Sequence, residues 1–66
     1  MHVTVNGEGL DLEKATSLQQ LLAHLNIGEG RIAVELNGEI VAKSQISRQA
    51  LVEGDKIEIV QAIGGG

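Results

Sequence analysis

The first twelve residues alternate between hydrophobic and polar side chains, which is the period of a strand with one buried face. The alternation is interrupted once, by Asn6-Gly7. This pair favours a two-residue hairpin turn, because asparagine and glycine accept the positive φ that both turn positions need. Residues 1–12 are therefore predicted to form a β-hairpin. Its apolar positions are Met1, Val3, Val5, Leu10 and Leu12.

Between residues 16 and 26 the hydrophobic period lengthens to that of a helix. Thr16 is expected to be the N-cap, and Gln19, three residues later, to complete a capping box. Asn26 and Gly28 can both take the left-handed conformation that ends a helix. We expect a helix of about three turns with one apolar face. That face is formed by Leu18, Leu21, Leu22 and Leu25.

Three further segments complete the pattern. Residues 32–42 alternate around a second Asn-Gly pair, which predicts a second hairpin. Residues 43–52 are mostly polar with scattered apolar positions, which predicts a loop with a short helical turn. Residues 56–63 alternate as a last strand. In the loop, the side chains expected to point inward are Ile46, Ala50 and Leu51.

The predicted order of elements is strand, strand, helix, strand, strand, strand. One helical face can cover one side of one sheet, which is a stable two-layer arrangement for a small domain. The order predicts the α+β class and a β-grasp fold, with a mixed sheet of four to five strands and one main helix packed on one face. The first and last strands are expected to lie parallel at its centre. Residues 1–63 would form the domain, and residues 64–66 a flexible C-terminal glycine tail.

Composition narrows the class of partner. The 66 residues carry a net charge of -4, with no cysteine and no aromatic side chain. Binding to phosphates needs clustered Lys or Arg, and binding to single strands commonly adds aromatic stacking, so nucleic acid is not an expected partner. A basic protein surface is expected instead. Short apolar runs and the lack of a signal-peptide pattern predict a cytoplasmic protein without membrane contact.

Residues suited to catalysis are scarce. His2 and His24 are the only histidines, and neither has a partner at catalytic spacing. The serines lack a G-x-S-x-G elbow, the carboxylates are scattered singly, and no His/Cys cluster is spaced for a metal. Gly28-x-Gly30 follows a helix and precedes a strand, the reverse of a phosphate-binding loop. The sequence predicts a protein that is not an enzyme and binds no metal or cofactor itself.

The C-terminal run Gly64-Gly65-Gly66 is the remaining chemical feature. Glycine allows close backbone approach and leaves the terminal carboxylate sterically open. Extended at about 3.3 Å per residue, the run would carry that carboxylate roughly 10 Å beyond the sheet, far enough to enter the active site of another protein. The alternative is a frayed glycine-rich end without a function.

Five segments together carry a resemblance to a known family. They are Asn6-Gly7-Glu8, residues 34–41 (Val-Glu-Leu-Asn-Gly-Glu-Ile-Val), the Gly54-Asp55 turn, Glu58-Ile59-Val60 and the final Gly64-Gly65-Gly66. In this order, and over essentially the whole chain, they resemble the ThiS family, the sulfur carriers of thiamine biosynthesis. The resemblance implies a ubiquitin-like β-grasp fold and a protein cosubstrate rather than an enzyme.

The resemblance also implies chemistry at the α-carboxylate of Gly66. A ThiF-like adenylating enzyme would use ATP and magnesium to convert this carboxylate to an acyl-adenylate. A sulfur-donating desulfurase system would then supply the sulfur that leaves a thiocarboxylate. A thiazole synthase would take that sulfur for thiazole formation, while Gly64 and Gly65 would provide the slim backbone for entry into each partner.

Contacts with a partner are expected beside the glycine tail. If the isoleucines of the last strand point to the core, Val60 and Ala62 must point to the open face of the sheet. The candidate contacts are Glu58, Val60, Ala62 and Ile63, with Glu35 and Glu39 adding negative charge around them.

Two other functions are compatible with the same fold. The small subunit of molybdopterin synthase shares it and ends in Gly-Gly, but usually in a longer chain with aromatic and proline residues before the tail. A β-grasp module that only binds a partner would leave the glycines inert. One residue added after Gly66 separates a carrier from such a module, because only the carrier would lose its activation by ATP.

Overall fold

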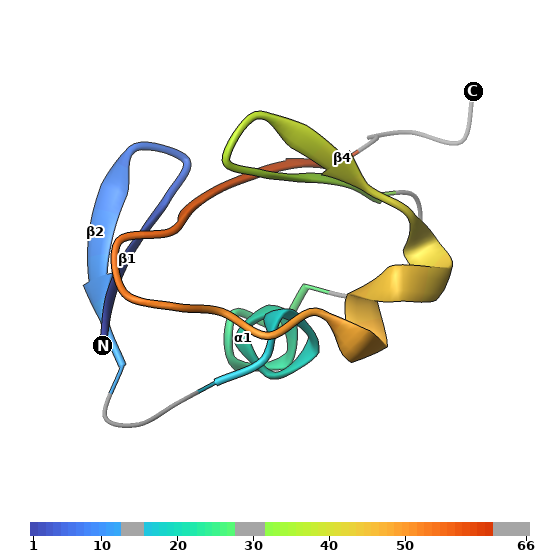
Figure 1. The fold of residues 1–66 in the computed structure, drawn as a ribbon. Helices are drawn as coiled ribbons and strands as arrows, with labels where there is room; N and C mark the ends of the chain where they lie inside the picture. The colour runs from blue at the N-terminus through green and yellow to red at the C-terminus, as the bar shows by residue number, and fades with distance from the viewer. Residues whose placement is uncertain (13–15, 28–31, 62–66) are drawn as a thin grey trace.

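The computed structural model describes residues 1–12, 16–27 and 32–61. Two strands, a helix, two strands, a short 3-10 helix and a final strand follow one another along the chain (Figure 1). This is the predicted order, with the expected helical turn in the loop before the last strand. The elements are β1 His2–Val5, β2 Glu8–Asp11, α1 Leu18–His24, β3 Ile32–Leu36, β4 Glu39–Val41, η1 Lys43–Arg48 and β5 Lys56–Gln61.

The five strands form one mixed sheet in the order β2-β1-β5-β3-β4. β1 and β5 are parallel, with Thr4 opposite Lys56 and Val5 opposite Ile57. The pairs β1–β2, β3–β4 and β3–β5 are antiparallel. The first and last strands therefore lie side by side, and α1 lies below the sheet in the view of Figure 1. The predicted β-grasp fold is confirmed.

Both predicted hairpin turns have the expected backbone. Asn6 and Gly7 have φ values of 51° and 84°, and Asn37 and Gly38 have values of 52° and 86°. A positive φ at both central residues matches the right-handed twist of the flanking strands. The two Asn-Gly pairs thus fix both hairpins.

The helix begins one residue later than predicted and is shorter. Ser17, not Thr16, is the N-cap: its hydroxyl accepts a hydrogen bond from the Gln20 N–H at 3.1 Å, and the Gln20 side chain accepts one from the Ser17 N–H at 2.9 Å. The Thr16 carbonyl accepts a bond from the Leu51 N–H at 3.2 Å, which holds Thr16 outside the helix. The helix has 7 residues, or two turns instead of three.

Asn26 ends the helix as predicted, with a φ of 59°. The Ile27 N–H donates to the Leu22 carbonyl at 2.8 Å, and the Asn26 N–H donates to the Ala23 carbonyl at 3.1 Å. These two bonds form a Schellman motif, which closes the helix after its second turn. Gly28, the other predicted cap, lies outside the described residues, as does the rest of the Gly28–Gly30 loop.

The core is aliphatic and lies between α1 and the sheet. Leu51 is buried and Ile46 packs against the core, as predicted, but Ala50 is exposed, so the prediction for Ala50 is wrong. Ala50 forms an isolated β-bridge with Ser17, and alternation along this extended segment buries Leu51 instead. The buried apolar residues of the described segments are Val3, Leu18, Leu21, Leu22, Val34, Leu51, Ile57 and Ile59.

Candidate functional site

β5 is the central strand that leads toward the glycine run. Its side chains alternate between the two faces of the sheet: Ile57 and Ile59 are 1% and 8% exposed, whereas Val60 is 66% exposed. The predicted facing of this strand is confirmed for these residues. Glu58, another predicted contact, is exposed. The remaining predicted contacts and the site of the chemistry lie outside the described residues; they are Ala62, Ile63, Gly64, Gly65 and Gly66.

Val60 belongs to a patch on the sheet face that α1 leaves uncovered. Val60 lies opposite Ala33, and Glu58 lies opposite Glu35. Glu35 in turn lies opposite Ile40, which is 77% exposed. Directly opposed residues of antiparallel strands share a face and contact one another. We refer to these five residues of β3, β4 and β5 as the open-face patch.

Glu35 and Glu58 place two negative charges opposite each other within the open-face patch. Like charges in this position destabilise a sheet. Neither carboxylate forms an ion pair with a described residue, so no described cation offsets the repulsion at ion-pair distance. A partner's Lys or Arg side chain would do so. Glu39 was also expected here, but it lies opposite Leu36 and hence on the alternate face, so that prediction is wrong.

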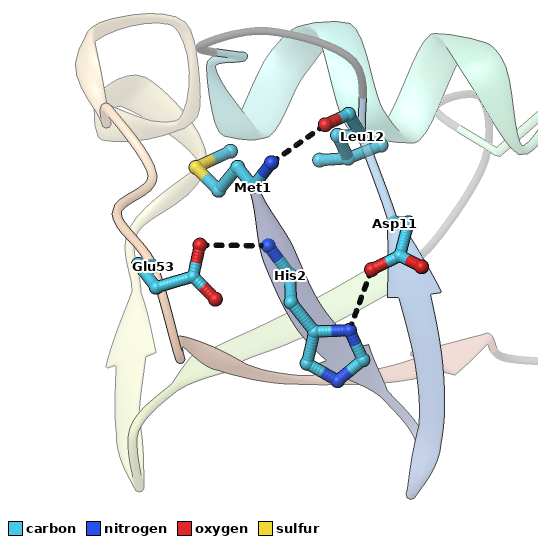
Figure 2. A network of polar contacts seen from close by, with 5 residues as sticks. All are labelled: Met1, His2, Asp11, Leu12 and Glu53. Atoms are coloured by element: carbon cyan, nitrogen blue, oxygen red, sulfur yellow. Dashed lines mark hydrogen bonds and ion pairs between the residues drawn. The ribbon is translucent and has the colours of Figure 1, made fainter.

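His2 lies on the same uncovered face, on β1, the strand next to β5. Its Nδ1 is 2.8 Å from Asp11 Oδ1, and its backbone N–H donates to Glu53 Oε1 at 3.0 Å (Figure 2). The hairpin register places Asp11 opposite His2, so the ring has a hydrogen-bond partner that was not identified from the sequence. The ring also lies so close to Gly9 that a Cβ there would be 2.9 Å from His2 Cε1. None of these neighbours offers a hydroxyl or thiol, so the contact holds the hairpin together without forming a catalytic pair.

A groove of about 770 Å³ lies between α1, η1 and the end of β5. Lys43 is the one ionisable side chain among its described lining residues. In residues 1–12, 16–27 and 32–61, no three His, Cys, Asp or Glu side chains come together as a metal site would require. The described part of the chain also has no helix whose length and apolarity would let it cross a membrane. The described lining of the groove therefore contains no acid–base pair.

Two asparagine side chains that fix β5 were not predicted from the sequence. Asn6 Oδ1 accepts a bond from the Ile59 N–H at 2.7 Å, and Asn37 Oδ1 accepts one from the Lys56 N–H at 2.9 Å. Asn37 Nδ2 also donates to the buried Asp55 carboxylate at 2.9 Å. One feature of the sequence indicates these bonds. Both turns have Asn at a position where Asp or Gly would also form the turn, and only Asn carries a hydrogen-bond donor and an acceptor on one side chain.

A mixed sheet with one helix on one face, whose central last strand runs out toward a glycine-rich end, defines a ubiquitin-like β-grasp protein. The model of the ThiS family matches residues 3–66. The chain belongs to the ThiS family, the family of the sulfur carrier of thiamine biosynthesis.

Individual relatives agree with this family. The sulfur carrier protein ThiS of Bacillus subtilis is 36% identical over 63 residues, covering 94% of this chain and 96% of that protein. A thiazole synthase of Paramagnetospirillum magneticum is 41% identical over all 66 residues, but this chain spans only 20% of its length. The crystal structure of the thiamine biosynthesis protein ThiS of Geobacter metallireducens superposes with a TM-score of 0.84 at 29% identity, over 100% of both chains.

Proposed function

We propose that this chain is a sulfur carrier in thiamine biosynthesis and that it reacts through the α-carboxylate of Gly66. The observation that carries the proposal is the position of β5, a central strand that passes the exposed open-face patch and leads to Gly64-Gly65-Gly66. A strand held in a sheet gives a partner a fixed surface to bind, while glycines after it provide a narrow backbone for an active site. Membership of the ThiS family supports the same role.

The chemistry requires activation, because a carboxylate is a poor electrophile until one of its oxygens becomes part of a leaving group. A ThiF-like adenylating enzyme would bind ATP and magnesium, a Gly66 carboxylate oxygen would attack the α-phosphorus, and pyrophosphate would leave. A sulfur nucleophile from a desulfurase system, at the oxidation level of hydrosulfide, would then attack the acyl carbon, and AMP would leave. A persulfide donor would in addition need a thiol to reduce the acyl disulfide that it forms. The product is the Gly66 thiocarboxylate. The chain acts as a cosubstrate, and the nucleotide and metal belong to the enzyme.

A thiazole synthase is the proposed acceptor of the sulfur. Thiazole synthases of two bacteria contain a region similar to this whole chain. Joining a carrier to its acceptor in one polypeptide raises the effective concentration of each for the other. The occurrence of the carrier-like region within these larger proteins therefore supports a direct encounter between this chain and a thiazole synthase.

Intact mass tests the proposal. The chain is incubated with the adenylating enzyme, ATP and a sulfur source, and its mass is expected to rise by about 16 Da, the difference between sulfur and oxygen. Omitting ATP is expected to prevent the gain, since the acyl-adenylate is then not formed. An unchanged mass in the complete mixture, with an enzyme that is active on another carrier, would exclude the proposed chemistry.

The open-face patch is the proposed docking surface for the adenylating enzyme. Val60→Asp is expected to weaken docking about tenfold, because it places a third negative charge next to Glu58 in an interface centred on an apolar side chain. Val52→Asp is the matched control, since Val52 is also a valine, is 62% exposed and lies outside the patch. Titration calorimetry measures the affinity, and thermal unfolding shows whether both variants remain folded.

Equal affinities for the Val60→Asp and Val52→Asp variants would place the docking surface elsewhere on the chain. Unfolding of the Val60→Asp variant alone would contradict the exposed position of Val60 on the sheet.

A further inference from the structure

The parallel pairing between β1 and β5 ends before β5 does. β1 stops at Val5, since the chain then reverses through Asn6 and Gly7. β5 continues to Gln61, with β3 beside it as far as the pair of Ile32 and Gln61. The half of β5 nearest the glycine run therefore has a neighbouring strand on its β3 side only, among the described elements.

The side chain of Asn6 takes the place of the missing strand. On this side of β5 alternate residues bond to β1, and the Asn6 N–H donates to the Ile57 carbonyl at 2.8 Å. Ile59 is next in the alternation, and both of its backbone groups bind the Asn6 amide. The Ile59 N–H donates to Oδ1 at 2.7 Å, and the Ile59 carbonyl accepts from Nδ2 at 3.3 Å. An asparagine amide can do this because it presents a donor and an acceptor in one plane, as a peptide group does.

We infer that Asn6 is a positioning residue for the reaction of Gly66. The inference rests on the proposed function of the chain as a carrier. By holding Ile59, Asn6 keeps the end of β5 in the sheet and fixes the direction in which the chain continues toward the glycine run. A partner that recognises the ordered strand then does not have to order it on binding. When the strand end is ordered in a smaller fraction of the molecules, the apparent affinity of the partner falls by the same factor.

Asn37 provides a matched control within the same chain. It occupies the equivalent position of the second hairpin turn, with a φ of 52° against 51° for Asn6. Its side chain holds the opposite end of β5, where the Lys56 N–H donates to Oδ1 at 2.9 Å. Glycine at either position keeps the positive φ and removes the amide. Asn6→Gly and Asn37→Gly thus release different ends of one strand.

Two measurements on the full chain test the inference: amide hydrogen exchange, and pyrophosphate release by the adenylating enzyme at varied carrier concentration. In Asn6→Gly, exchange of the Ile59 amide is expected to be at least about tenfold faster, because the bond that protects it is gone. The KM for the carrier is expected to rise about threefold to fivefold, with kcat within about twofold of wild type, since the bound strand is ordered again. Asn6→Asp keeps the acceptor but not the donor, and is expected to show smaller changes of both kinds.

Asn37→Gly is expected to leave the Ile59 exchange rate and the KM near their wild-type values. An unchanged KM in Asn6→Gly would overturn the inference, because the strand end would then need no side chain to hold it. Equal increases of the KM in the two glycine variants would also overturn it, because a general loss of stability would then be the cause. If Asn6→Gly does not fold, Asn6→Asp is compared with Asn37→Gly in its place. If the wild-type chain supports no pyrophosphate release, the proposed function fails, whereas the exchange rates still decide whether Asn6 holds β5.

Discussion

Deletion of Gly66 is expected to abolish ATP-dependent activation of the chain, with a fall in rate of at least about 100-fold. The deletion leaves a terminal carboxylate on Gly65, but about 3.3 Å short of its former position. A displacement of about 1 Å already costs about 100-fold when two reacting groups must be aligned. Pyrophosphate exchange measures the activation, and intact mass shows whether any thiocarboxylate is formed.

Adding one alanine after Gly66 tests the same step from the other direction. The extension keeps every residue of the chain and displaces the carboxylate outward, so it is also expected to abolish activation. Gly66→Ala keeps the length and adds only a Cβ, and is expected to retain more activity than either. If the extended chain is activated as well as the wild type, the reacting atom is not the Gly66 carboxylate, and a β-grasp module that only binds its partner becomes the better description.

The fold was predictable because its local patterns and its topology agree. Each Asn-Gly pair both terminates one strand and has the backbone freedom that a tight hairpin needs, so the two hairpins are fixed by residues 6–7 and 37–38. The alternation of Ile57, Ile59 and Val60 predicted correctly which side chains of β5 face the core. Side chains of a strand point alternately to the two faces of the sheet, and only one of the two possible orientations of β5 buries both isoleucines.

The errors arose where two local patterns compete and tertiary contacts decide between them. Thr16 and Ser17 each have a glutamine three residues later, and the backbone bond from Leu51 to the Thr16 carbonyl selects Ser17 as the cap. Glu39 and Ala50 were placed on the wrong sides because each lies where a short strand or bridge begins, and a shift of one residue there reverses the facing.

The candidate site was predictable only in part for a related reason. Val60 and Glu58 follow from the alternation within one strand, but Ala33 and Ile40 join them only through the register between strands. The Asn6 side chain was overlooked because the turn alone accounts for an asparagine at that position. Its bonds to Ile59 join residues from opposite ends of the chain, and no local pattern encodes such a pair.

Leu21→Ala is expected to remove about 3–5 kcal/mol of the free energy of unfolding, which is the usual range for a leucine that leaves a cavity. Leu21 is 0% exposed and lies on α1, the one described helix that packs on the sheet. The chain has no aromatic residue and no cysteine, so neither a large side chain nor a disulfide can compensate for the lost contacts. A domain of this size has a total stability of only about 3–10 kcal/mol, at roughly 0.05–0.15 kcal/mol per residue. The variant is therefore expected to be largely unfolded or close to it, as urea denaturation would show.

Ile40→Ala is the control for this experiment, since Ile40 is 77% exposed and its truncation opens no cavity. Its cost is expected to stay below about 1 kcal/mol, in line with substitutions away from buried contacts. The pair also separates folding from docking: Leu21→Ala reduces activation by lowering the folded fraction, whereas Ile40→Ala acts only through the open-face patch. If both variants lose the same small amount of stability, α1 does not pack on the sheet as described, and the fixed position of β5 on which the carrier proposal depends is lost with it.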